Sequence, residues 1–239
     1  MRWAAALVAP VALGCLDTPP RDLSEPDAAR PPALAAAYRF EEPDPLADSS
    51  DNGTDARCAG DECPTWIADR EGFGQAAQFD GVDDVVVADE SGEGPFTIMS
   101  WLRMDADVAA NAVCPFNRPY GVAGDNTYQL CLQVVTPGIA TLHFYTTEEP
   151  RRLSVDVAME SATWHHAAIR WDGTQKMITW DGFDIAVGEG KTAFDASGLR
   201  LGSDIDGQIV VASFSGALDD LQIWDGALSE EGIAEAAGL

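Results

Sequence analysis

The chain has 239 residues, of which 40 are acidic and 14 are basic, so its formal net charge is -26. Apolar residues make up 46% of the chain, which is enough for a packed core and more than a disordered acidic tail contains. The charge argues against nucleic acid and against an anionic membrane surface as partners, because both are bound through clustered Lys and Arg. The sequence contains no run of 18 apolar residues, the pattern that predicts a transmembrane helix.

The N-terminus has the features of an export signal. Arg2 precedes an apolar stretch, Trp3–Leu13, that is too short to span a bilayer. Gly14 and Cys15 follow, and a small residue before a Cys resembles the lipobox of bacterial lipoproteins, which implies cleavage before Cys15 and lipidation of it. We therefore expect residues 1–14 to be a signal peptide and the protein to be lipid-anchored at the outer membrane or cell surface of a bacterium. Plain secretion, or a periplasmic location, is the alternative.

Residues 15–35 are expected to form a tether behind the lipidated Cys15. The segment lacks apolar periodicity and carries Pro19, Pro20, Pro26, Pro31 and Pro32 among acidic and basic residues. Proline favours extended backbone and removes a hydrogen-bond donor. Such a segment can hold a folded domain, residues 36–239, away from a membrane.

Residues 36–239 are predicted to form one all-β domain, a two-sheet antiparallel sandwich of about a dozen short strands. Large and polar side chains alternate along Tyr128–Val134, as in a strand with one buried face. Asp-Gly pairs separate such runs and are typical of tight hairpin turns, as at Asp172-Gly173. A short helical turn is predicted at the C-terminus, with Ser229 as its N-cap.

Four segments of this domain carry recognisable motifs. They are FDGVDDVVV at Phe79–Val87, FTIMSWL at Phe96–Leu102, WHHAA at Trp164–Ala168 and FSGALDDLQIW at Phe214–Trp224. In this order they resemble the laminin-G-like branch of the concanavalin A-like lectin and glucanase jelly rolls. The resemblance covers about residues 36–239 and implies a jelly-roll sandwich. It does not imply one ligand, because the fold carries lectins, adhesion modules, pentraxins and glycosidases.

The motifs of two enzyme classes are missing from the sequence. Laminarinase-like glycosidases of this fold place their carboxylates as Glu-x-Asp-x-x-Glu. Glu25 and Glu42 each begin this pattern, but Arg30 and Ala47 stand at its last position. The Gly-x-Ser-x-Gly elbow of a serine hydrolase does not occur either. We therefore expect a non-catalytic protein, with a glycoside hydrolase as the weaker alternative.

A structural calcium ion is expected near the chain ends. Alternation places Asp219 on the same face as Leu221 and Ile223, and a carboxylate on a buried face needs a partner or a cation. In related jelly rolls a calcium ion joins the first and last strands. Carried over, this implies Asp219 as the side-chain ligand, with Glu42 and Asp80 supplying side chains or carbonyls. The alternative is that Asp219 caps a turn through hydrogen bonds.

Four cysteines remain after Cys15, and an even number in an exported protein predicts two disulfides. Three pairings are possible. Local pairing, Cys58 with Cys63 and Cys114 with Cys131, is the simplest.

A sugar-binding surface is predicted on the less apolar faces of the strands. Those faces carry aromatic rings, planar amides and an arginine: Trp101, Arg103, Gln129, Gln133, His143 and Tyr145. A pyranose presents an apolar CH face and hydroxyl edges, which such side chains match. The sequence therefore predicts an extracytoplasmic module that binds carbohydrate or a surface glycoprotein. The alternative is a structural or protein-interaction domain of the envelope that binds no sugar and leaves these faces solvated.

Overall fold

The computed structural model describes residues 31–89, 92–105, 112–121, 125–206 and 209–239. The chain divides into two units, Met1–Arg30 and Pro31–Leu239, and the described residues all belong to the second. The predictions for the export signal and Cys15 therefore lie outside the described residues. None of the helices in the described part is long and apolar enough to cross a membrane.

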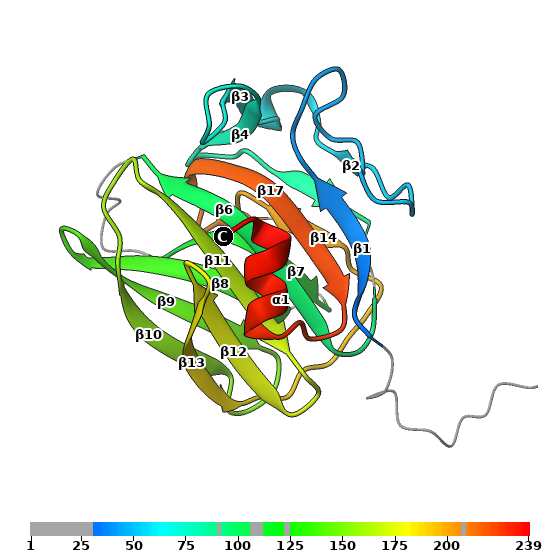
Figure 1. Cartoon of the computed structure of the whole chain (residues 1–239), viewed down its shortest axis with the longest axis vertical. Coiled ribbons are helices and arrows are strands. Elements are labelled where there is room, and N and C mark those ends of the chain that lie inside the picture. The colour runs from blue at the N-terminus through cyan, green and yellow to red at the C-terminus, as the bar shows by residue number, and fades with distance from the viewer. Residues whose placement is uncertain (1–30, 90–91, 106–111, 122–124, 207–208) are drawn as a thin grey trace, which may run out of the picture. The chain divides into compact units, whose positions relative to one another are not determined.

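Two antiparallel sheets form the sandwich that the sequence predicts (Figure 1). Sheet A contains, in spatial order, β13 (Phe183–Glu189), β12 (Gln175–Trp180), β11 (Trp164–Trp171), β6 (Phe96–Met104), β17 (Ser215–Asp225), β4 (Gln75–Asp80) and β3 (Thr65–Ala68), and β1 (Ala33–Tyr38) also pairs with β17. Sheet B contains β10 (Arg152–Ala158), β9 (Ile139–Thr146), β8 (Asp125–Thr136), β7 (Val113–Tyr120), β14 (Leu199–Leu201), β5 (Val86–Ala88) and β2 (Ala56–Arg57). A short hairpin of β15 (Asp204–Asp206) and β16 (Ile209–Val211) follows β14.

The first strand begins earlier than the sequence suggested. β1 starts at Ala33, so the predicted boundary between tether and domain, after residue 35, falls inside the strand. Residues 33 to 37 contain four alanines and one leucine, and such a run shows no contrast between large apolar and polar positions.

The core lies between the sheets because every second side chain of most strands points into it. Ile98 and Leu102 of β6 are fully buried there, opposite Leu130 of β8 and Phe144 of β9. The alternating runs noted in the sequence therefore mark the core positions correctly.

One helix, α1 (Glu230–Ala237), covers part of the outer face of sheet A (Figure 1). The hydroxyl of Ser229 accepts a hydrogen bond from the N–H of Gly232 at 3.0 Å, as predicted for an N-cap. Ile233 packs against Met99 of β6 and Ala168 of β11 in a small second core. The helix thus shields apolar residues that would otherwise face solvent.

An extra residue in the middle of β17 changes which of its side chains reach the core. The register with β6 shifts after Asp219, and Asp220 has a φ of 46°. The extra residue reverses the faces that the following side chains occupy. Leu218 and Leu221 both face the core, whereas Asp219 faces outward beside its partner Trp101. The predicted placement of Asp219 on the face of Leu221 is therefore wrong, because alternation does not extend through a bulge.

The bulge coincides with a change of partner along one edge of β17. The edge pairs with β4 from Ser215 to Leu218 and with β1 from Leu221 to Asp225. The two aspartates of the bulge lie between these partners. The edge of sheet A therefore has a gap at this point, which other side chains must fill.

Both disulfides pair as predicted, Cys58 with Cys63 and Cys114 with Cys131. Cys114 lies on β7 and Cys131 on the neighbouring strand β8. This second bridge therefore fastens two central strands of sheet B to one another.

The Cys114–Cys131 bridge should contribute more stability than the Cys58–Cys63 bridge. The sequence separations are 17 and 5 residues. Loop-closure entropy of the unfolded chain gives about 3 kcal/mol for the longer loop and about 2 kcal/mol for the shorter one. Urea unfolding of Cys114→Ala/Cys131→Ala and of Cys58→Ala/Cys63→Ala tests this order. A larger loss in the second double variant would contradict it.

Candidate functional site

The six side chains predicted to bind sugar lie on the outer faces of two different sheets. Trp101 and Arg103 belong to β6 of sheet A. The other four belong to β8 and β9 of sheet B: Gln129, Gln133, His143 and Tyr145. The core separates the two outer faces, so the six residues cannot form one groove. Alternation shows which side chains point away from the core, but it does not show which sheet a strand joins.

On sheet B, a continuous row of polar and aromatic side chains crosses the strands. Cross-strand pairing places them in the order Arg152, Tyr145, Gln129, Asn117 and Arg200, on β10, β9, β8, β7 and β14. Neighbouring strands lie about 4.8 Å apart, so the row is about 19 Å long. Gln129 and Tyr145 were predicted as ligand contacts, whereas the other three were missed. We call these five residues the sheet B row.

Hydrogen bonds hold the amides of the sheet B row in place. Gln129 donates through Nε2 to Oδ2 of Asp204 at 2.7 Å, and Asn117 donates through Nδ2 to the carbonyl of Ser203 at 2.7 Å. The Oδ1 atom of Asn117 is buried and accepts no hydrogen bond from the described residues. Burial lowers the pKa of Arg200, against the opposing effect of the Asp204 carboxylate. Asn117 is fully buried and Gln129 is 7% exposed, so the part of this pre-ordered row that a ligand can reach is Tyr145 with the two arginines and the rim of Gln129.

A second row of side chains lies next to the sheet B row on the same outer face, and its His143 packs beside Tyr145. His143 stands opposite Cys131 on β8, and its Nδ1 atom lies 2.8 Å from the hydroxyl of Ser154. Its ring centroid lies 5.8 Å from that of Tyr145. Burial, with the nearby charge of Arg152, lowers the pKa of His143, so the ring is neutral at neutral pH. Gln133 lies one row further, opposite Thr141.

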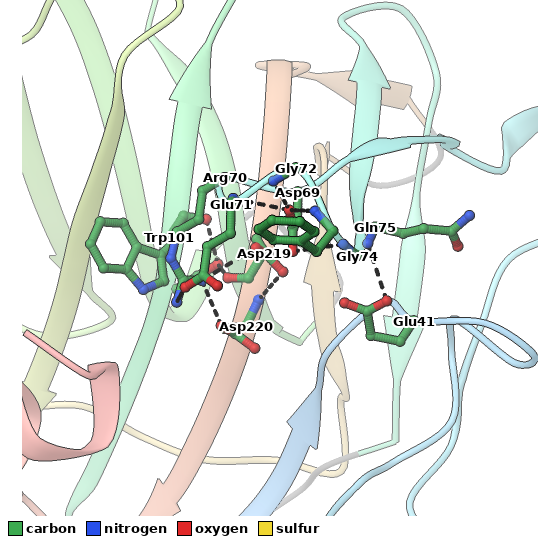
Figure 2. A network of polar contacts seen from close by, with 12 residues as sticks. Glu41, Asp69, Arg70, Glu71, Gly72, Gly74, Gln75, Trp101, Asp219 and Asp220 are labelled. Carbon is green, nitrogen blue, oxygen red and sulfur yellow. Dashed lines mark hydrogen bonds and ion pairs between the residues drawn. The ribbon is translucent and has the colours of Figure 1, made fainter.

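On the outer face of sheet A, Arg70 fills the gap at the bulge (Figure 2). Its Nη1 atom lies 2.6 Å from Oδ2 of Asp220 and 3.3 Å from Oδ2 of Asp219. Its guanidinium also lies 4.6 Å from the centroid of the Trp101 ring, and Trp101 meets the ring of His166 edge-on at 5.4 Å. The predicted sugar contact Trp101 is thus part of a packed ionic and aromatic cluster. Arg103, two residues after Trp101, has its Cζ atom 5.4 Å from the centroid of the Trp164 ring.

Burial shifts the protonation of this cluster. Asp219 is 3% exposed, and burial, with the charge of Asp220, raises its pKa to about 7. Burial lowers the pKa of His166 to about 4, so this histidine is neutral. The arrangement therefore holds one cation, Arg70, against two carboxylates of which one is reluctant to ionise.

The three carboxylates expected to bind calcium do not come together. Asp80 pairs with Ser215, which lies four residues before Asp219 on β17, a distance of about 13 Å along a strand. Glu42 is exposed beyond the end of β1, because Phe40 adopts a φ of 59° and ends the alternation. Asp219 also has Arg70 as its counter-ion. These residues therefore do not form the donor set that the resemblance implies.

Asp80 instead belongs to a turn between β4 and β5. Among the described residues, Asp80, Asp83 and Asp84 bring one carboxylate oxygen each within 4.8 Å of one another. Asp84 accepts a hydrogen bond from the N–H of Asp80 at 2.7 Å, and Asp80 accepts one from Val82 at 2.7 Å. Burial, with the charges of Asp80 and Asp83, raises the pKa of Asp84. The aspartates of the FDGVDD motif thus shape the turn.

The burial of Asp219 predicts a specific pH dependence of stability. Its folded pKa of about 7 lies above the ordinary value of 3.8, so the native state binds the proton more tightly. The contribution of this group to stability therefore falls as the pH rises between these two values. Asp219→Asn removes this titration and leaves Asp220 as the partner of Arg70. Between pH 5 and pH 8 we expect the free energy of unfolding to fall less in the variant, by about 1 kcal/mol or more.

Urea unfolding at several pH values measures this difference. Asp220→Asn is the comparison variant: it removes the partly exposed carboxylate and its charge, but burial, the larger cause, still raises the pKa of Asp219, so this variant should keep part of the pH dependence that Asp219→Asn loses. Parallel pH profiles for the wild type and Asp219→Asn would contradict the assignment.

A family model and several solved structures are similar to the chain. The model described as the concanavalin A-like lectin/glucanases superfamily matches residues 77–234, which is more than half of the chain. No curated protein sequence matches significantly. Domain 4 of AbnA, a GH43 extracellular arabinanase from Geobacillus stearothermophilus in complex with arabinotriose, has a TM-score of 0.63 at 18% identity. That match covers 86% of this chain and 98% of the domain.

Two further structures have the same fold at low identity. A SAP-like pentraxin from Limulus polyphemus has a TM-score of 0.54 at 20% identity, covering 67% of this chain and 80% of the pentraxin. The binding domain of botulinum neurotoxin serotype D has a TM-score of 0.62 at 13% identity. The match covers 86% of this chain and 51% of the toxin domain. These similarities establish a jelly-roll fold.

Proposed function

We propose that this chain, which belongs to the concanavalin A-like lectin and glucanase superfamily, is a carbohydrate-binding module that holds its ligand on the outer face of sheet B. The sheet B row is the observation that carries the proposal. It sets one aromatic ring, Tyr145, in line with two planar amides and two arginines. Tyr145 offers a face for the CH side of a pyranose, and Gln129 with the guanidinium groups of Arg152 and Arg200 offers hydrogen bonds to its hydroxyls. Asn117 is fully buried and holds the loop at Ser203 in place beneath the row.

The rigidity of this face supports a binding role. The row stands on the central strands of a sheet, and Asp204 fixes the side chain of Gln129. The Cys114–Cys131 bridge joins the two strands that carry Asn117 and Gln129. A surface ordered before binding loses less conformational entropy when a ligand arrives. The arabinanase domain that shares this fold was solved with arabinotriose, which supports carbohydrate as the class of ligand.

The proposed module is not catalytic. A glycosidase needs two carboxyl groups on opposite sides of one scissile bond. The two acids that are buried among the described residues, Asp84 and Asp219, lie in separate parts of sheet A and its neighbouring turn. Asp84 supports a turn and Asp219 faces Arg70. Neither shares a face with the sheet B row, and the carboxylate that does contact the row, Asp204, is bound to the Nε2 atom of Gln129 at 2.7 Å.

Removing the ring of Tyr145 should weaken sugar binding. A glycan array identifies the bound glycan, and isothermal titration calorimetry then measures its affinity for the variants. We expect Tyr145→Ala to bind about tenfold more weakly or worse, a loss of about 1.4 kcal/mol, while Tyr145→Phe keeps most of the affinity because the ring remains. Trp164→Ala, on the outer face of sheet A, is the control and should bind normally.

Two results would count against this assignment. Equal affinity of Tyr145→Ala and the wild type would show that the sugar does not bind the sheet B row. Loss of binding in Trp164→Ala would show that it binds the outer face of sheet A instead. If the array shows no glycan bound by the wild type, the alternative of an envelope domain without sugar binding takes its place.

We also propose that the module works outside the cytoplasm, fixed to a bacterial surface through a lipid on Cys15. The order of apolar stretch, small residue, cysteine and proline-rich segment supports this address. Cell fractionation tests it: the Cys15→Ala protein should leave the membrane fraction or accumulate with its signal uncleaved. Normal cleavage together with an unchanged membrane fraction would exclude lipidation.

A further inference from the structure

One edge of β1 is covered by a polar loop in place of a strand. β1 pairs with β17 along its other edge. In the loop of residues 48–54, Asp48 accepts a hydrogen bond from the N–H of Ala37 at 2.9 Å, and the hydroxyl of Ser49 donates to the carbonyl oxygen of Ala37 at 3.0 Å. Side chains of the loop thus satisfy backbone groups that an edge strand otherwise leaves open.

Asn52 supplies this cover at the start of β1. Its Nδ2 atom donates to the carbonyl oxygens of Leu34 and Ala35, each at 3.0 Å. The register of β1 against β17 shifts between Leu34 and Ala36, so Ala35 lies in a bulge, where backbone groups need partners outside the ladder. The hydroxyl of Ser50 accepts a hydrogen bond from the N–H of Asn52 at 3.2 Å. The amide of Asn52 is therefore the donor that holds the loop on the start of β1.

The residue after Asn52 leaves this amide open to attack by the backbone. Asn52 is the only one of the four asparagines in the sequence that glycine follows. Both Asn52 and Gly53 are exposed, and no atom lies within 4 Å of the position of a Cβ at Gly53. Among the described residues, none accepts a hydrogen bond from the N–H of Gly53. The nitrogen next to the side-chain amide is thus in contact with water and free of steric cover.

We propose that Asn52 is a site of spontaneous deamidation that irreversibly loosens the start of β1. The backbone nitrogen of Gly53 attacks Cγ of Asn52 and loses its proton to water, while the bond from Cγ to Nδ2 breaks and the amide leaves as ammonia. Water then opens the cyclic imide at either of its carbonyl groups, which leaves aspartate or isoaspartate at position 52. The net reaction exchanges ammonia for water and needs no enzyme, oxidant or reductant.

The product cannot replace the amide in the structure. A carboxylate has no hydrogen to donate, and its charge would face the carbonyl oxygens of Leu34 and Ala35. Isoaspartate also runs the main chain through the former side chain, which lengthens the turn. The two hydrogen bonds hold Nδ2 while the loop is closed, so the reaction proceeds when the loop opens locally. After the reaction the loop cannot close on β1 as before.

Peptide mapping by mass spectrometry tests the reaction on the full chain, kept at mildly alkaline pH. The peptide that contains Asn52 should gain the mass difference between a hydroxyl and an amino group, and an isoaspartyl methyltransferase should label it. Asn117 and Asn126 are internal controls, because arginine and threonine follow them, and they should stay unchanged. Ser50→Ala should speed the reaction about fivefold, the factor that one lost hydrogen bond gives in an opening equilibrium.

Two variants separate the lost hydrogen bonds from the added charge. Asn52→Ala removes the donors and should lower the melting temperature by about 2 to 4 °C, and Asn52→Asp, which has the side chain of one product, should lower it further. Backbone hydrogen exchange in β1 should be faster in Asn52→Asp than in the wild type. Ser161→Asp is the matched control, because it adds a carboxylate to an exposed turn where the serine side chain bonds to no described residue. It should melt as the wild type does.

Three results would overturn the proposal. They are an Asn52 that stays unmodified, a reaction that affects Asn117 and Asn126 as much as Asn52, and an Asn52→Asp variant that melts with the wild type. A glycan mass on Asn52 would also overturn it, because Asn-Gly-Thr is an acceptor sequence for that modification. Tyr145→Ala should deamidate at the wild-type rate, so failure of the sugar proposal and failure of this one are distinguishable.

Discussion

The bulge in β17 is the constraint on which the outer side of sheet A depends. It lies where the edge of β17 passes from β4 to β1, and there the strand leaves two backbone positions without a strand partner on that edge. Arg70 fills the gap through Asp219 and Asp220, and the stacking of Arg70 on Trp101 ties the gap to β6. The same arginine fixes the end of β3 and the loop that follows it. The inserted residue thus positions the packed ionic and aromatic cluster on this face.

Four basic residues of this acidic chain show two different physical roles. Arg118 is almost fully buried and donates to backbone carbonyls, including that of Ser197 at 2.8 Å. Arg170 is buried against Asp184. Such side chains satisfy polar groups inside the fold and are not available to a ligand. Arg152 and Arg200 differ because they lie on the sheet B row, where a ligand can reach their guanidinium groups.

Sequence patterns predicted the features that depend on neighbours close in the chain. Alternation marked the core positions of β8, and short spacing indicated both disulfides. The features that depend on register were not predictable. Nothing in the sequence distinguishes Asn117 and Arg200 from other polar residues until cross-strand pairing aligns them with Tyr145. Asp219 was misplaced for the same reason, because a bulge has no signature in a run such as Ala217–Leu221. Phe73, between Gly72 and Gly74, is an exposed aromatic residue that the sequence could have indicated, but only the hydrogen bonds of its loop to Asp69 show that the loop is ordered.

The sheet B row and the cluster around Arg70 lie on opposite outer faces of the sandwich, so a ligand held on one face does not touch the other. A shallow face that contacts sugar through one ring, one amide and two guanidinium groups binds weakly, because it excludes little water from its hydrogen bonds. Several such modules held close together on one surface would convert the second contact with a polymeric glycan into an intramolecular step. Effective concentrations in the millimolar range then raise the avidity by about 10²-fold or more without any new contact.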